Sequence, residues 1–159
     1  MNTLTKTLAG VFLLLSPWFL VQVFILIAAP DEAFEEMPIC SDSSSNCAHI
    51  GGGEYHRMDL TTVVLEGQSL EETTSLALEY IDDQGGDILF ESESESEYFV
   101  HFVEHTPFWL FPDDVVLLIT AEGDNSSKIE LHSESRLGRG DLGVNPERLE
   151  TFYEALTSD

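Results

Sequence analysis

Apolar positions are distributed unevenly along the chain, because one uninterrupted apolar run precedes a region in which apolar and polar residues alternate. No charged residue occurs between Thr7 and Pro30, and residues 8–29 are almost entirely apolar. A helix needs roughly 20 such residues to span a bilayer, and membrane helices tolerate a proline such as Pro17. The pattern therefore predicts a transmembrane anchor at residues 8–29.

A cleaved signal peptide is the alternative interpretation of the same run. The apolar region of a signal peptide is normally about 7–15 residues long and ends at a small-x-small site. This run is longer, and Pro30 follows it directly, so we favour a retained anchor. Lys6 precedes the run and acidic residues follow it, which by the positive-inside rule predicts a cytoplasmic N-terminus (residues 1–7) and an external C-terminal domain.

The segment after the anchor, residues 30–54, is acidic, then serine-rich, and then contains three consecutive glycines. This composition is typical of a linker, so we expect the folded domain at residues 55–159. The linker contains Cys40 and Cys47. In an external compartment a local disulfide between them is expected, whereas a cytoplasmic domain would keep two free thiols.

Beyond the linker, the spacing of apolar residues predicts strands and helices in blocks. Ser69 and Glu72 form a capping box that begins a helix, and Gly85 follows its last turn. Asn145 and Pro146 are placed to cap and begin a final helix. Strands are expected at residues 60–65, 87–91, 98–104, 115–121 and 128–135. Consecutive strands between two helices favour an α+β domain, with an antiparallel sheet of about four to six strands and two helices packed on it.

The large negative charge of the chain indicates that the protein works at high salt. The formal net charge is −24, and all 30 acidic residues lie after residue 30. Hydrophobic residues make up 43% of the chain and aromatic residues 10%, which is too much for a disordered acidic segment. We therefore expect a folded domain with an acid-coated surface, as in halophilic archaea. Direct binding of nucleic acid is disfavoured, because no basic stripe is present to neutralise phosphates, and we expect no nucleic-acid partner.

The basic residues are few, yet three of the six lie in one short glycine-rich segment, as Arg136, Arg139 and Arg148. One interpretation gathers them around the start of the final helix, where backbone N–H groups and the helix dipole favour a small anion. The other interpretation pairs them internally. Their candidate partners are Asp113, Asp114 and Asp141. We favour internal pairing, because isolated arginines in so acidic a chain find carboxylates.

Three segments of the chain resemble a known family, the one called domain of unknown function 1499. These segments are the pair of cysteines with Asn46 between them, the Pro-Asp-Asp-Val element at residues 112–115, and residues 135–148, which read Ser-Arg-Leu-Gly-Arg-Gly-Asp-Leu-Gly-Val-Asn-Pro-Glu-Arg. The resemblance covers about residues 40–156. It supports the fold and the boundaries and implies no activity. The chain departs from the family pattern after the first cysteine, where Ser41 replaces a proline.

Metal and cofactor chemistry has little support in the sequence. Cys40, Cys47, His49 and His56 are possible zinc ligands, but their spacing matches no standard pattern, and we expect no metal and no cofactor. A Gly-x-Ser-x-Gly elbow and a phosphate-binding glycine loop are both missing from the sequence.

Two further segments have surface interpretations. Residues 108–111, which read Phe-Trp-Leu-Phe between two prolines, are either core or an exposed lip that touches a membrane or a partner. Asn125 begins an Asn-Ser-Ser sequon on an expected turn and is a glycosylation candidate if the domain is external.

Together these patterns favour a single-pass membrane protein with an external, non-catalytic α+β domain. Its expected partners are the lipid bilayer, through the N-terminal helix, and an envelope protein or a small anionic ligand. The role would be ligand binding, partner binding or structure at the cell envelope. The alternative is a hydrolase with a site formed by Asp113, Asp114, Arg136 and Asp141.

The acidic surface predicts a domain whose stability increases with salt. At molar salt the Debye length is about 3 Å, so repulsion between the carboxylates is largely screened. Chemical unfolding of the full chain in detergent, at low and at molar potassium chloride, measures this effect. Greater stability at low salt would contradict it.

Overall fold

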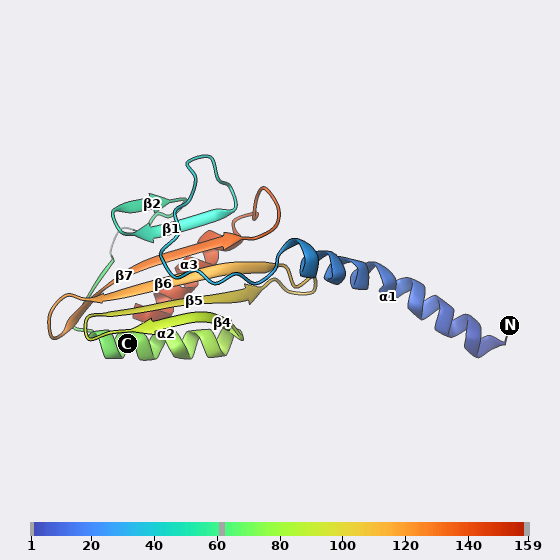
Figure 1. Ribbon diagram of the computed structural model, residues 1–159, viewed down its shortest axis with the longest axis horizontal. Coiled ribbons are helices and arrows are strands. Elements are labelled where there is room, and N and C mark those ends of the chain that lie inside the picture. The colour runs from blue at the N-terminus through green and yellow to red at the C-terminus, as the bar shows by residue number, and fades with distance from the viewer. Residues whose placement is uncertain (1, 61–62, 158–159) are drawn as a thin grey trace.

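The computed structural model describes residues 2–60 and 63–157. Its first element is α1 (Thr3–Ala28), a helix that extends away from one end of the domain (Figure 1). Asn2 caps its first turn by accepting a hydrogen bond from the backbone N–H of Thr5. Within the described residues, α1 is the one helix long and apolar enough to cross a membrane.

A seven-stranded antiparallel sheet forms the centre of the domain. The strand order is β2-β1-β7-β6-β5-β4, and β3 pairs with β7 beside this path. The strands are β1 (Cys47–Gly51), β2 (Glu54–His56), β3 (Val64–Glu66), β4 (Asp87–Glu93), β5 (Glu97–His105), β6 (Pro112–Ala121) and β7 (Ser126–Ser135). The long strands β5, β6 and β7 are central, and β6 pairs along its length with β5 on one side and with β7 on the other.

Two helices, α2 (Leu70–Gln84) and α3 (Val144–Thr157), pack on one face of the sheet. The capping box of Ser69 and Glu72 forms as expected, and Gly85 ends α2 in the left-handed conformation. Tyr80 of α2 and Phe152 of α3 stack with their ring centroids 4.2 Å apart. This contact joins the two helices over the apolar core.

The predicted class is confirmed: an α+β domain with an antiparallel sheet and two helices packed on it, preceded by an apolar helix. The sheet has more strands than expected, because β1 and the first residue of β2 lie in residues 30–54, which the sequence analysis assigned to a linker. The glycines there form the β1–β2 turn instead. Gly51 has φ +106°, and a Cβ atom at this position would lie 2.8 Å from the Cα of Glu130.

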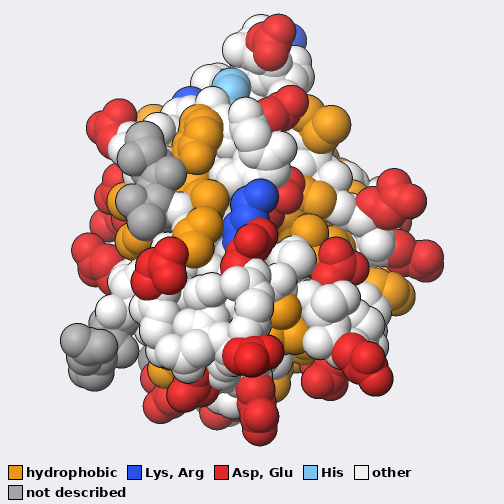
Figure 2. Space-filling view, turned by 90° about the vertical axis from the view of Figure 1, so that its left-hand side faces the viewer, with side chains coloured by type: hydrophobic (Ala, Val, Ile, Leu, Met, Phe, Trp, Pro, Cys, Tyr) orange, Lys and Arg blue, Asp and Glu red, His pale blue; other side chains and the backbone are white. Residues whose placement is uncertain are grey.

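The two faces of the sheet have different chemistry, because successive strand residues point to opposite sides. The helix-covered face contains the apolar core. The other face contains His49, His101, His132 and Asp114, all buried, and the chain between α1 and β1 crosses part of it. Acidic side chains are scattered over the end of the domain opposite α1 (Figure 2).

Candidate functional site

Asp113 and Asp114 are neighbours at the start of β6, and the pleat directs them to opposite faces of the sheet. Both are buried, with 2% and 3% of their surface exposed. Each carboxylate meets a different arginine. The pair is therefore two separate structural sites and not one site with two carboxylates.

On the helix face, Asp113 contacts Arg148 of α3. The Nη2 atom of Arg148 donates to Asp113 Oδ2 at 2.8 Å, and its Nε atom donates to Glu104 Oε2 at 2.8 Å. Its Nη1 atom donates to the side chains of Asn145, at 2.7 Å, and Ser133, at 3.1 Å. Arg148 is 8% exposed, so this network fixes α3 on the sheet from within.

On the opposite face, Asp114 contacts Arg136. The Nε and Nη2 atoms of Arg136 donate to the two oxygens of Asp114 at 2.9 and 2.8 Å, which is a bidentate ion pair. His101 is the other partner of Asp114, with Nε2 2.7 Å from Oδ1. Burial raises the pKa of Asp114, but hydrogen bonds and charge from His101 and Arg136 lower it by more, so the net shift is downward.

The same arginine holds the chain where it leaves α1. Arg136 Nη1 donates to Asp31 Oδ1 at 2.6 Å and to the carbonyl oxygen of Pro30 at 3.2 Å. The backbone N–H of Phe34 donates to Nδ1 of His101 at 2.9 Å, so His101 uses its Nε2 hydrogen to donate to Asp114. The Phe34 ring also stacks on His101, with the centroids 4.6 Å apart. Arg136 and His101 therefore fix the exit of α1 against the sheet.

Asp141 pairs with Arg57, a residue that the sequence analysis did not select. Arg57 donates from Nη1 and Nη2 to the two oxygens of Asp141, at 2.9 and 2.7 Å. Asp141 also accepts hydrogen bonds from the backbone N–H groups of Gly143 and Asn145, so it occupies the start of α3 that Asn145 was expected to cap. Burial raises the pKa of Asp141, but Arg57 and the Gly143 N–H outweigh it and lower the pKa to about 2.

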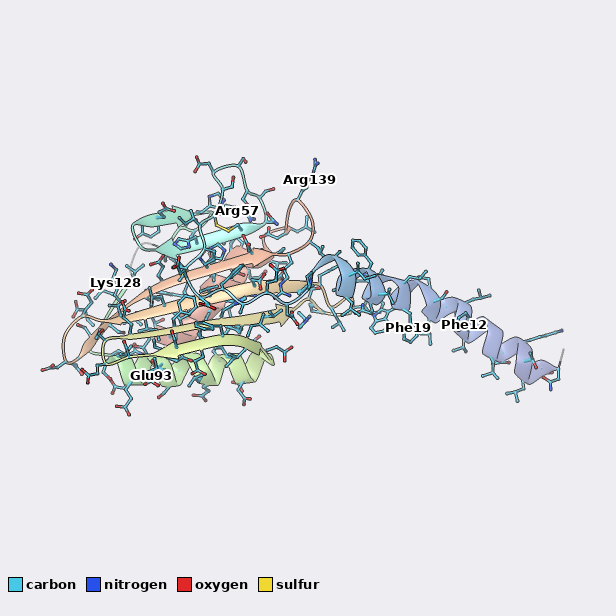
Figure 3. The ribbon with its side chains drawn as sticks, in the orientation of Figure 1. Phe12, Phe19, Arg57, Glu93, Lys128 and Arg139 are labelled. Carbon is cyan, nitrogen blue, oxygen red and sulfur yellow. A yellow bond between two sulfur atoms is a disulfide. The ribbon has the colours of Figure 1, made fainter. Side chains whose placement is uncertain are left out.

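The less favoured interpretation from sequence, one anion site shared by Arg136, Arg139 and Arg148, has no counterpart among the described residues, because these arginines lie apart. Arg136 and Arg148 lie on opposite faces with carboxylate partners, and the start of α3 is occupied by Asp141. Arg139 differs from both. It is exposed, it extends from the β7–α3 loop (Figure 3), and within the described residues it makes no ion pair.

Cys40 and Cys47 form a disulfide that lies beside two buried histidines. The Sγ atom of Cys47 is 3.6 Å from Nε2 of His132, and the Nδ1 atoms of His132 and His49 are 3.3 Å apart. Cys40, Cys47 and His132 place ligand-type atoms within 4.8 Å of one another, a geometry that suits a metal only with both cysteines reduced. The sequence analysis considered His56 in this set, but His56 contacts the carbonyl oxygen of Ser44.

The aromatic segment lies in the β5–β6 loop, against α1. Trp18 Nε1 donates to the carbonyl oxygen of Phe108, and Gln22 Nε2 donates to that of Trp109, both at 2.8 Å. Phe108 is 69% exposed and Leu110 is 41% exposed. Of the two interpretations from sequence, this geometry favours an exposed lip.

A largely apolar pocket of about 580 Å³ lies between this loop, the β7–α3 loop and Phe24 of α1. The side chains that give it its apolar character include Trp109, Phe111, Leu137 and Val144. The pocket also borders Asp113 and Asp141, but both carboxylates are engaged by arginines.

Asn125 lies in the β6–β7 turn and is exposed. Its backbone oxygen accepts a hydrogen bond from the N–H of Gly67. This turn is at the end of the domain opposite α1 (Figure 1), so an attached glycan would point away from the α1 end.

These features define the chain as an apolar helix joined to a small α+β domain whose buried arginines are paired with carboxylates. A family model described as "Protein of unknown function (DUF1499)" matches residues 33–156. The match covers most of the chain, and the chain belongs to this family. No curated protein and no solved structure matched the chain.

Replacing Arg148 by methionine is expected to lower the free energy of unfolding by about 3–5 kcal/mol, because Asp113 and Glu104 would stay buried without a cation. Arg139→Met is the matched control and should change it by no more than about 0.5 kcal/mol. Denaturant unfolding of the full chain in detergent measures both. Equal effects of the two substitutions would contradict the structural role of Arg148.

Stability should also decrease as the pH falls from about 6.5 to about 4. Burial, and next the charge of His132, lower the pKa of His49 from 6.5 to about 4. The unfolded chain therefore binds a proton in this range and the folded chain does not, so the contribution is complete above pH 6.5 and is lost below it.

The measurement compares the unfolding free energy at pH 7 and pH 5 for the wild type and His49→Gln. The loss should be smaller in the variant by roughly 1–2 kcal/mol. His105→Gln, which removes a histidine from a more exposed site, is the control. Identical losses in the wild type and His49→Gln would show that His49 does not govern this pH range.

Proposed function

We propose that the protein is a single-pass membrane protein whose domain lies outside the cell, against the bilayer, and has a non-catalytic binding or structural role at the envelope. The observation that carries this proposal is the use of the charged residues. Arg57, Arg136 and Arg148 bind carboxylates of the domain itself, and Arg136 also holds the residues that leave α1. The buried arginines and aspartates of the domain therefore stabilise the fold and its junction with α1.

Membrane attachment is supported by the length and composition of α1. Its 26 residues correspond to about 39 Å at 1.5 Å per residue, compared with a hydrocarbon core of about 30 Å. The aromatic loop packs beside its last turns through Trp18 and Gln22.

An external location is supported by two features. Disulfides persist in oxidising compartments, and Cys40 and Cys47 are joined in the structure. Lys6 lies before α1, and the acidic residues lie after it, which agrees with a cytoplasmic N-terminus.

The internal ion pairs disfavour the hydrolase alternative at Asp113, Asp114, Arg136 and Asp141. A general acid or base needs access to substrate and a pKa near the working pH. The pKa of Asp114 and that of Asp141 are both shifted downward, and these carboxylates are buried against arginines. Each aspartate also has a structural role that accounts for its position.

Protease treatment of intact cells tests the topology. In cells that express the chain with different tags at its two ends, the C-terminal tag should be digested from outside and the N-terminal tag protected. The intact mass should include residues 1–29. Protection of the C-terminal tag until lysis would reverse the orientation, and a mass that begins near residue 30 would identify a cleaved signal peptide.

Leu14→Arg is a useful companion variant, because Leu14 is 81% exposed in the middle of α1. A central arginine disfavours membrane insertion by about 2.5–3.5 kcal/mol. The variant should therefore shift the chain from the membrane fraction to the soluble or degraded fraction. Unchanged membrane retention at alkaline pH would argue that α1 is not the anchor.

A further inference from the structure

We propose that the pocket beside α1 binds one acyl chain of an anionic phospholipid and that Arg139 binds the phosphate of the same lipid. This inference rests on the proposed membrane attachment and adds a ligand and a site to it. Three independent features support it: the lining of the pocket, its position against α1, and the one arginine of the segment that forms no ion pair with a described residue.

The lining suits a hydrocarbon chain. Phe24, Trp109, Phe111, Leu137 and Val144 supply apolar surface to a space of about 580 Å³. The polar groups nearby are already satisfied, since Asp113 and Asp141 are bound to arginines. A polar substrate would therefore find few free groups to recognise it, whereas an acyl chain requires none.

The position of the pocket selects a lipid over a free apolar ligand. Phe24 belongs to α1, so one wall of the pocket is the membrane helix itself. The β5–β6 and β7–α3 loops, which form the other walls, both lie at the end of the domain from which α1 departs (Figure 1). Exposed apolar side chains continue outward from the pocket on both loops: Phe108, Leu110 and Leu142, the last fully exposed. These side chains are suited to a lipid surface.

Arg139 supplies the charge for a headgroup. It lies between Gly138 and Gly140, which both border the pocket, and its side chain is exposed. The hydroxyl of Ser45 donates to the Arg139 carbonyl oxygen at 2.5 Å, which holds this part of the loop in place. Arginine binds phosphate through two parallel hydrogen bonds, so an acyl chain in the pocket and a phosphate at Arg139 fit one amphiphile.

The test uses the full chain, reconstituted in phosphatidylcholine vesicles that contain phosphatidylglycerol as the anionic lipid. Flotation with the vesicles reports anchoring by α1. Mild detergent extraction followed by native mass spectrometry reports retained lipid. The wild type should float and retain a single lipid, enriched in phosphatidylglycerol relative to the vesicles. Failure to float would refute membrane attachment, whereas flotation without retained lipid would refute the pocket alone.

Variants separate the two parts of the site. Leu137→Trp and, independently, Val144→Trp fill the pocket and should abolish lipid retention while flotation continues. Arg139→Ala should keep the lipid but reduce the preference for phosphatidylglycerol about fivefold, the contribution of one basic residue near an anionic surface. Lys128→Ala removes the same charge at the other end of the domain (Figure 3) and should leave the preference unchanged.

Three results would overturn the proposal. Equal lipid retention in the wild type and both tryptophan variants would place the lipid outside the pocket. An equal preference for phosphatidylglycerol in Arg139→Ala and Lys128→Ala would show that Arg139 does not bind the phosphate. A dimer mass that both tryptophan variants abolish would assign the pocket to a second copy of the chain.

Discussion

The fold depends on two adjacent carboxylates at the start of β6 that point to opposite faces of the sheet. Because Asp113 and Asp114 point to opposite faces, one short segment binds an arginine on each side of the sheet. Arg148 joins α3 to the helix face, and Arg136 joins the exit of α1 to the other face. A buried carboxylate requires its cation, so neither arginine can leave without destabilising the domain. The domain therefore needs Arg136 and Arg148, although basic residues are scarce in the chain.

Local patterns in the sequence were sufficient for the parts of the fold that local physics determines. Ser69, Glu72 and Gly85 act within one helix, and the alternation along β7 follows from the pleat alone. The strand at Cys47–Gly51 was missed, because serines precede it, glycines follow it, and it is only five residues long. Its burial comes from pairing with β7, which lies more than 80 residues later in the chain.

The candidate site was harder to predict, because its contacts are long-range. Arg57 and Asp141 are 84 residues apart, and the only signal for Arg57 was the rarity of basic residues. His132 reaches the disulfide from another strand in the same way. The clustering of three arginines in sequence suggested one shared site, yet a strand end, a loop and a helix direct them to three different environments.

Exposed acidic, apolar and basic side chains are distributed unevenly between the two ends of the domain. Acidic side chains occupy the end opposite α1, where water and salt can solvate and screen them (Figure 2). The exposed apolar side chains of the β5–β6 loop lie at the α1 end, where the acidic residues that directly follow α1 also lie. Arg139 extends from the β7–α3 loop at this same end (Figure 3), and it forms no ion pair with any residue in the ranges 2–60 and 63–157. If the α1 end faces the bilayer as proposed, an exposed arginine at that end offsets part of the repulsion between so acidic a domain and anionic lipid.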